Sequence, residues 1–250
     1  MVNGPRGTVN GGRIGERARE RDAERNGEGN TMITRTGLLE ELRNRRLVAI
    51  IRGSDPAASV RTALTLAEEG VHLVEVSLSG RDGLAVIEEI ARTAGDAVRL
   101  GAGTVLTGDD ARRARDAGAA YIVTPSLGAG VDEALRLDLP VLAGALTPTE
   151  TAAAVAAGAT AVKLFPASAH GPAYLSALRD PFPEVPFVPV GGVGAAEAPA
   201  FLARGAIAVG VGSPLCGDAP HGGDLAELRD RARTFIAALE TGAAGRRAGS

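Results

Sequence analysis

Two charged residues interrupt otherwise apolar segments, and their types could serve as a nucleophile and a proton shuttle. Glu75 lies in VHLVEVSL (71–78) and Lys163 lies in TAVKLF (160–165). Side chains alternate between the two faces of a strand, and we expect the faces that carry these charges to point into one apolar interior. Desolvation there would favour a neutral amine, which is nucleophilic, and a protonated carboxyl, which can transfer a proton.

A buried ion pair between Glu75 and Lys163 is the alternative interpretation. Removing two charges from water costs free energy that their attraction often fails to offset, so such a pair is weak support for stability. The composition adds to the argument, because Lys163 is the only lysine among 27 Lys and Arg residues. Arginine cannot supply a neutral amine, whereas lysine can. Chance retention in an arginine-rich chain is possible on the count alone, but the position within an apolar strand favours catalysis.

Short apolar runs alternate with helical patterns, and this alternation predicts an α/β fold. The expected strands are residues 47–51, 71–78, 98–103, 120–125, 140–146, 160–165, 186–192 and 207–213. The helical patterns that follow them are residues 56–69, 82–93, 108–117, 131–137, 148–157, 172–179, 195–203 and 225–239. Eight strand–helix units in succession favour a single (β/α)8 TIM barrel, with a doubly wound open sheet as the alternative.

The ends of the chain differ in composition from the barrel region at 37–240. Residues 1–36 are rich in Gly, Asn, Arg and Glu and have few large apolar side chains, so we expect a disordered N-terminal extension. Residues 241–250 are expected to form a flexible tail.

Bulk properties exclude several classes of partner and site. A net charge of −3 gives no reason to expect nucleic acid or an anionic membrane surface, and no apolar run approaches the roughly 20 residues of a membrane helix. The single cysteine, Cys216, cannot form an internal disulfide, which favours a cytoplasmic location. His72, His170 and His221 are scattered without carboxylate partners at ligand spacing, so no metal site is expected. We interpret His221 as solvent-exposed.

Active residues of such barrels stand at the carboxyl ends of the strands and in the loops that follow. The last two expected strands end in VGGVGA and VGVGS, where Gly191, Gly192, Gly212 and Ser213 lie. Backbone N–H groups at glycine turns that precede a helix bind phosphate, and the loops after strands seven and eight often do so. The substrate is therefore expected to carry a phosphate or a similar anion.

Five segments together resemble the 2-keto-3-deoxy-6-phosphogluconate (KDPG) and 4-hydroxy-2-oxoglutarate (KHG) aldolase family. They are LVEVSL, GAGTVL, IVTP, VKLFPAS and PVGGV, in order across about residues 37 to 240. The resemblance implies a (β/α)8 barrel, a homotrimer, and class I (Schiff-base) chemistry on a small 2-keto acid without a metal or cofactor. It assigns Lys163 as the Schiff-base lysine and Glu75 as the acid/base. It implies substrate-binding roles for Thr104, Pro125, Phe165, Gly191, Gly192 and Ser213.

Two positions depart from the gluconate-type pattern. Many such members have arginine where Ser79 stands, and we expect Arg52, at the end of the first strand, to supply the missing charge. Many also have threonine where Val190 stands; valine there, with FPASAHGP, is more similar to aldolases for the galactonate epimer. The stereochemistry at C4 of the substrate therefore stays open.

The expected reaction is cleavage of 2-keto-3-deoxy-6-phospho sugar acids to pyruvate and glyceraldehyde 3-phosphate, and also of 4-hydroxy-2-oxoglutarate to pyruvate and glyoxylate. Two alternatives remain. One is a non-lyase phosphate-binding barrel enzyme, an isomerase or synthase, in which Lys163 acts only as a charge. The other is a non-catalytic barrel that binds keto acids.

Overall fold

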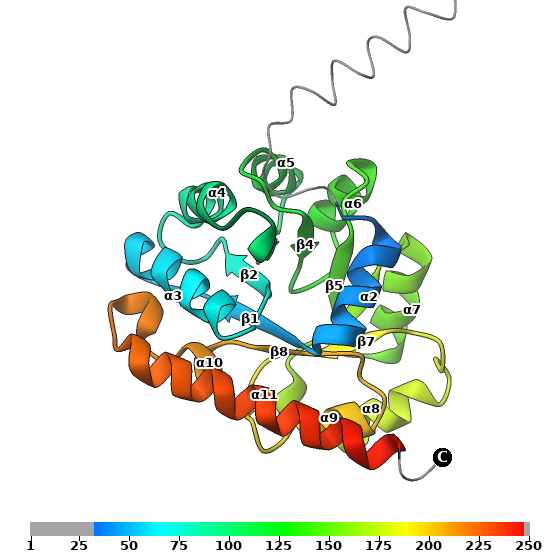
Figure 1. The fold of residues 1–250 in the computed structure, drawn as a ribbon. Helices are drawn as coiled ribbons and strands as arrows, with labels where there is room; N and C mark the ends of the chain where they lie inside the picture. Colours follow the sequence, from blue (N-terminus) through cyan, green and yellow to red (C-terminus); the bar gives the residue numbers. More distant parts are fainter. Residues whose placement is uncertain (1–32, 248–250) are drawn as a thin grey trace, which may run out of the picture.

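A computed structural model describes residues 33–247, with side chains described for residues 33–240. Eight parallel strands alternate with helices, as predicted (Figure 1). The strands are β1 (Leu47–Ile51), β2 (Leu73–Ser77), β3 (Arg99–Gly103), β4 (Tyr121–Val123), β5 (Val141–Ala145), β6 (Ala161–Leu164), β7 (Phe187–Pro189) and β8 (Val209–Val211). The α-helices are α2 (Arg35–Arg45), α3 (Pro56–Glu68), α4 (Gly83–Ala94), α5 (Gly108–Asp116), α6 (Ala129–Arg136), α7 (Pro148–Ala157), α8 (Gly171–Arg179), α9 (Ala198–Ala203), α10 (Ser213–Cys216) and α11 (Leu225–Arg247). Three short 3-10 turns are η1 (Gly95–Ala97), η2 (Ala167–Ala169) and η3 (Ala219–His221).

The sheet closes almost completely into a barrel. Strands β1 to β7 pair with one another in sequence order, and β1 also pairs with β8. The remaining join, between β7 and β8, is made by a parallel bridge between Val190 and Gly210 and by the Ile207 N–H, which donates to the Phe187 carbonyl at 3.0 Å. The (β/α)8 barrel is therefore confirmed, and the open doubly wound sheet is excluded.

Apolar side chains form two separate clusters, one on each face of the strands. Val74 and Val76 of β2 face outward, into the larger cluster that the strands share with the surrounding helices. Leu73 of β2 and Ala161 of β6 face inward, into the smaller cluster inside the barrel. This alternation is what strands buried on both faces require, and it sets which side chains can reach the interior.

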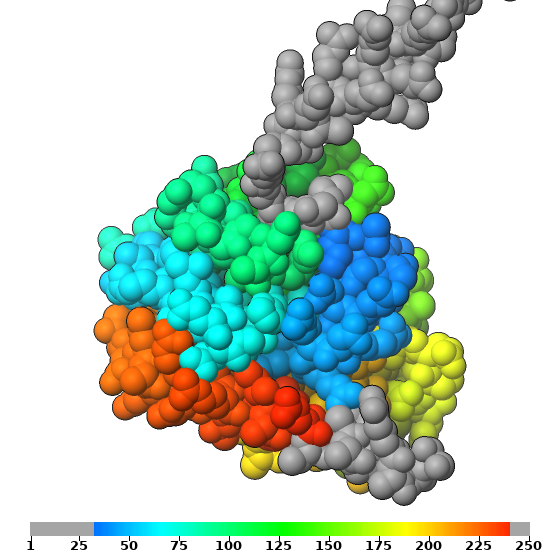
Figure 2. Space-filling model, in the orientation of Figure 1, coloured from blue at the N-terminus to red at the C-terminus, as the bar shows by residue number. Residues whose placement is uncertain are grey.

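Helix α2 closes the end of the barrel at which the strands begin. Its Leu38 and Leu42 are fully buried and belong to the interior cluster, together with Val48 and Leu73 from the first two strands. Thr34 caps the helix by accepting from the Gly37 N–H at 3.1 Å. Figures 1 and 2 show α2 in blue on the face toward the viewer, where it fills the space between the cyan elements and the green and yellow ones.

The structure differs from the sequence expectation mainly at the ends of the barrel region. Helix α2 was not predicted from the sequence, and it begins at Arg35, before the expected boundary at residue 37. Helix α11 continues to Arg247, beyond the expected end at Leu239. Of the N-terminal extension expected to be disordered, 1–36, residues 1–32 fall outside the described residues, whereas the prediction is wrong at its end, where α2 begins. The flexibility of 241–250 stays a prediction. No helix within residues 33–247 is long and apolar enough to span a membrane.

The closing role of α2 predicts a large loss of stability from a small cavity. We expect Leu42→Ala to lower the free energy of unfolding by about 2 to 5 kcal/mol, because the closed barrel around it cannot collapse into the space. Leu106→Ala is the matched control, since Leu106 is 55% exposed and its truncation should change stability by roughly 0.5 kcal/mol or less. Urea unfolding measures both, and equal effects would contradict the closing role of α2.

Candidate active site

The side chains of Glu75 and Lys163 both point into the interior of the barrel. Glu75 follows the inward-facing Leu73 by two residues on β2, and Lys163 follows the inward-facing Ala161 by two residues on β6. The expectation that both charged faces point into the barrel is confirmed by these packing clusters. Lys163 Nζ lies 3.9 Å from Glu75 Oε1, and the two residues are 6% and 2% exposed.

The electrostatics of the pair follow from its burial. Loss of solvation raises the pKa of Glu75 above its ordinary value of 4.5, and the nearby charges of Lys163 and Arg52 oppose this rise. The 3.9 Å separation exceeds a hydrogen-bond length, and no described residue donates a hydrogen bond to the Glu75 carboxylate. The carboxylate thus lies near the amine but accepts no hydrogen bond from a described residue. It is therefore available to exchange protons with a bound molecule.

A glycine on the neighbouring strand makes room for the carboxylate. Gly103, at the end of β3, pairs with Ser77 of β2. A Cβ atom at Gly103 would collide with the Oε1, Cδ and Cγ atoms of Glu75. The Glu75 side chain therefore occupies the space that any other residue at 103 would fill.

Tyr121 holds the strand segment that carries Glu75. Its ring is fully buried in the barrel, and its hydroxyl donates to the Val74 carbonyl at 3.0 Å. Burial raises the pKa of Tyr121 well above 10, and the charge of Glu75 adds to the rise. The phenol therefore stays protonated and fixes the peptide unit from which Glu75 projects.

Three hydroxyl groups form a chain beside the pair. Ser77 Oγ lies 2.8 Å from both Ser79 Oγ and Thr104 Oγ1. Thr104 has φ 59°, a left-handed conformation that is strained for a β-branched residue. Such strain is tolerated where surrounding contacts fix the backbone, and it is commonest at functional sites.

A cavity of about 840 Å³ opens above the Glu75–Lys163 pair at the carboxyl ends of the strands. All ten residues predicted to act or to bind substrate line it: Arg52, Glu75, Thr104, Pro125, Lys163, Phe165, Gly191, Gly192, Gly212 and Ser213. Lys163 Nζ also lies 5.3 Å from the centre of the Phe165 ring. Arg52 is exposed to the cavity, and its guanidinium forms no ion pair with a described carboxylate. The cavity thus contains a buried amine, a buried carboxylate and the Arg52 guanidinium, which forms no ion pair with a described carboxylate.

His221 lines the same cavity, which was not predicted from the sequence. It is exposed, as predicted, but its Nδ1 lies 2.9 Å from Ser54 Oγ and 3.2 Å from the Ser54 backbone nitrogen. Its place after the eighth strand, where barrel enzymes put active-site loops, was the signal that the sequence contained.

The other histidines lie elsewhere. His170 packs against Tyr174 with ring centroids 4.6 Å apart and does not line the cavity. His72 lies at the opposite end of the barrel, where its Nδ1 is 2.9 Å from the Ala97 carbonyl. Within residues 33–240, no group of three His, Cys, Asp or Glu side chains is arranged to hold a metal ion.

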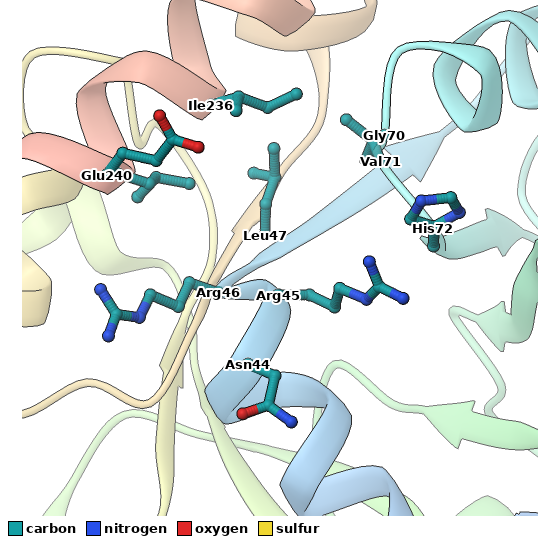
Figure 3. A pocket seen from close by; sticks show the side chains of 10 residues that line it. Asn44, Arg45, Arg46, Leu47, Gly70, Val71, His72, Ile236 and Glu240 are labelled. Atoms are coloured by element: carbon teal, nitrogen blue, oxygen red, sulfur yellow. The ribbon is translucent and has the colours of Figure 1, made fainter. Parts of the chain in front are cut away.

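A second, smaller hollow of about 210 Å³ lies where the strands begin. It is lined by the end of α2, the start of β1, the residues before β2 and the end of the described part of α11. Figure 3 shows Arg45 and Arg46 extending away from each other there. The apolar side chains of Leu47, from β1, and Ile236, from α11, also line the hollow. The hollow has no amine and carboxylate in a shared apolar interior, so its chemistry differs from that of the large cavity.

Known proteins resemble the chain over most of its length. A family model described as KDPG and KHG aldolase matches residues 38–229. A probable 2-dehydro-3-deoxy-6-phosphogalactonate aldolase of Rhizobium meliloti (strain 1021) is 34% identical over 198 residues, which are 78% of this chain and 92% of that protein. A 2-dehydro-3-deoxy-phosphogluconate aldolase of Treponema pallidum (strain Nichols) is 35% identical over 164 residues, covering 65% of this chain and 76% of that protein. A solved structure described as native KDPGal is similar at a TM-score of 0.74 and 30% identity, covering 79% of this chain and 95% of that one.

The tight contact at Gly103 predicts a sharp response to one added methyl group. Gly103→Ala should destabilise the fold by roughly 1 to 3 kcal/mol, because Glu75 or the strand must move. Gly108→Ala is the matched control, since the nearest atoms to a Cβ there belong to the flexible side chains of Glu133, at 3.3 Å, and Arg112, at 3.6 Å. Urea unfolding compares the two, and a Gly103→Ala protein as stable as the control would show that Glu75 does not need this space.

Proposed function

The chain belongs to the KDPG and KHG aldolase family, and from that membership we propose that it is a class I aldolase in which Lys163 forms a Schiff base with a 2-keto-3-deoxy-6-phospho sugar acid. Its relatives are carbon–carbon lyases, and so is this protein. The observation that carries the Schiff-base proposal is the near-complete burial of the chain's single lysine beside Glu75. A buried amine beside a proton carrier is the arrangement that covalent amine catalysis requires.

In the proposed mechanism, the Lys163 amine attacks the C2 ketone of the substrate and forms a carbinolamine. Loss of water, with Glu75 passing protons, gives an iminium. Glu75 then takes the C4 hydroxyl proton, directly or through a water. The C3–C4 bond breaks, its electron pair moves into an enamine on Lys163, and the aldehyde leaves. Protonation of the enamine at C3 and hydrolysis of the resulting iminium release pyruvate and regenerate the amine. A six-carbon phosphorylated substrate yields glyceraldehyde 3-phosphate as the aldehyde.

The cavity wall supports an assignment for each end of the substrate. We assign the carboxylate next to C2 to Arg52 and the Thr104 hydroxyl, because both line the cavity that contains the amine. Pro125 and Phe165 would flank the pyruvyl carbons. We assign the phosphate to Gly191, Gly192, Gly212 and Ser213, at the ends of β7 and β8, where backbone N–H groups can donate to its oxygens.

Several finer features belong to the same proposal. One relative is named as a probable galactonate-type aldolase and another as a gluconate-type aldolase, so both C4 epimers are candidate substrates. Cleavage of 4-hydroxy-2-oxoglutarate to pyruvate and glyoxylate is a proposed second activity. A homotrimeric assembly and a cytoplasmic location are proposed from the family resemblance alone.

The Schiff base predicts one covalent adduct at one position. Incubation with pyruvate and borohydride should add one reduced pyruvyl group to the peptide that contains Lys163, as measured by mass spectrometry. The assignment is clean because the only other primary amine is the N-terminus. Lys163→Arg should give no adduct and no detectable cleavage, because a guanidinium does not become a neutral nucleophile at working pH.

Lys163→Met, which keeps an unbranched side chain, serves as a second inactive variant if the buried arginine disturbs the fold. A folded wild-type protein that forms no adduct would overturn the Schiff-base proposal and favour a non-lyase or binding role for Lys163.

The raised pKa of Glu75 predicts where activity falls on the acidic side. The carboxylate must be ionised to accept the C4 hydroxyl proton, so kcat/KM should fall as pH decreases through the raised pKa, with a midpoint above 4.5. His72→Ala, at the other end of the barrel, should retain the same midpoint. Circular dichroism across this pH range separates loss of activity from unfolding. A midpoint at or below 4.5 in the folded enzyme would argue against Glu75 as the base.

A further inference from the structure

The turn that carries His221 is docked against the loop after β1. The Pro220 carbonyl accepts from the Asp55 N–H at 3.4 Å and from the Ser59 hydroxyl at 3.5 Å. Gly53 allows this approach, because a Cβ there would collide with the Pro220 carbonyl oxygen. Within the turn, the His221 N–H donates to the Asp218 carbonyl at 2.8 Å. The His221 side chain is exposed, but the backbone from which it projects is held in place by these hydrogen bonds.

Ser54 determines which ring nitrogen of His221 can donate to a ligand. The Ser54 backbone N–H can only donate, and it lies 3.2 Å from Nδ1, so Nδ1 must accept. The neutral imidazole consequently carries its proton on Nε2. No described residue provides a partner for Nε2. His221 therefore brings one N–H donor, fixed in tautomer by the backbone, to the wall of the cavity.

We infer that His221 binds the phosphate end of the substrate by donating from Nε2 to a phosphate oxygen. The inference rests on the proposed function. C1 and C2 of a 2-keto acid are bonded, so the carboxylate must lie at the depth of Lys163, which is 6% exposed. The phosphate is the anion farthest from C2 and must lie nearer the opening. His221 is exposed at that opening, on the segment that follows Ser213.

Neutral donors are common partners of phosphate because hydrogen bonds to a charged acceptor are stronger than those between neutral groups. His221 would complement the glycine turns after β7 and β8 from the side of the cavity formed by the loop after β1. Its binding would then depend on a contact between two loops that are far apart in sequence, at Ser54 and His221.

The test compares kcat/KM for a phosphorylated 2-keto-3-deoxy sugar acid and for the same acid without phosphate. His221→Ala should lower kcat/KM for the phosphorylated acid by about tenfold or more, mainly through KM, as expected for loss of a hydrogen bond to a charged group. The value for the unphosphorylated acid should change by less than about twofold, within the effect of a surface substitution.

Two further substitutions at position 221 test whether the Nε2 position is the one that matters. His221→Gln places an amide N–H near the position of Nε2 and should recover part of the loss, whereas His221→Asn reaches only toward the position of Nδ1 and should not. His72→Ala should leave both substrates unaffected.

Equal losses for both substrates, or no loss for either, would overturn the inference. The pyruvate–borohydride adduct on Lys163 separates this result from failure of the proposed function. If wild type and His221→Ala both form the adduct while the substitution changes kcat/KM by the same factor for both substrates, only the proposed role of His221 is wrong. If wild type forms none, the Schiff-base proposal itself fails.

Discussion

A primary amine and a carboxylate share the interior of the barrel at 3.9 Å, and neither has enough water around it to solvate a charge fully. This shared desolvation explains much of the surrounding structure. Gly103 leaves the space that the carboxylate occupies, and Tyr121 fixes the strand segment from which it projects. A buried pair of this kind adds little to stability, so its retention within apolar strands points to chemistry.

The two ends of the barrel divide stability and function between them. Where the strands begin, Leu38 and Leu42 of α2 fill the interior with apolar atoms and keep water from reaching the pair from below. Where the strands end, glycine turns, hydroxyl groups and the uncommitted Arg52 line an open cavity of about 840 Å³. Among the described residues, the cavity that reaches Lys163 opens at this end, and in the proposed function the substrate enters there. This asymmetry lets one small interior be both a packed core and the proposed reaction site.

Much of the site could be predicted from the sequence because it depends on strand periodicity. Glu75 and Lys163 interrupt apolar runs, and the period of two fixes which neighbours share their face. Helix α2 could not be placed in the same way, since the side chains that bury Leu38 and Leu42 come from several strands distributed along the chain. The contact of His221 with the cavity could not be predicted for a similar reason. Its partner Ser54 is 167 residues away in sequence, and only the folded barrel brings the loops after β1 and β8 together.

The two departures from the gluconate-type pattern act on the cavity in different ways. Ser79 replaces a cation by a hydroxyl already bonded through Ser77 to Thr104, and Arg52 provides a guanidinium in the same cavity from the loop after β1. In the proposed function, Arg52 binds the substrate carboxylate in place of a cation at position 79. Val190 offers only methyl groups, one of which lies so close to Gly210 that a Cβ there would approach it to 2.7 Å. Position 190 therefore has no hydroxyl that could form a hydrogen bond to the substrate and so help to distinguish its C4 epimers. We expect any such selectivity to come from the remaining polar groups of the wall, from the shape that Val190 gives the cavity and, in the proposed mechanism, from the direction in which Glu75 reaches the C4 hydroxyl.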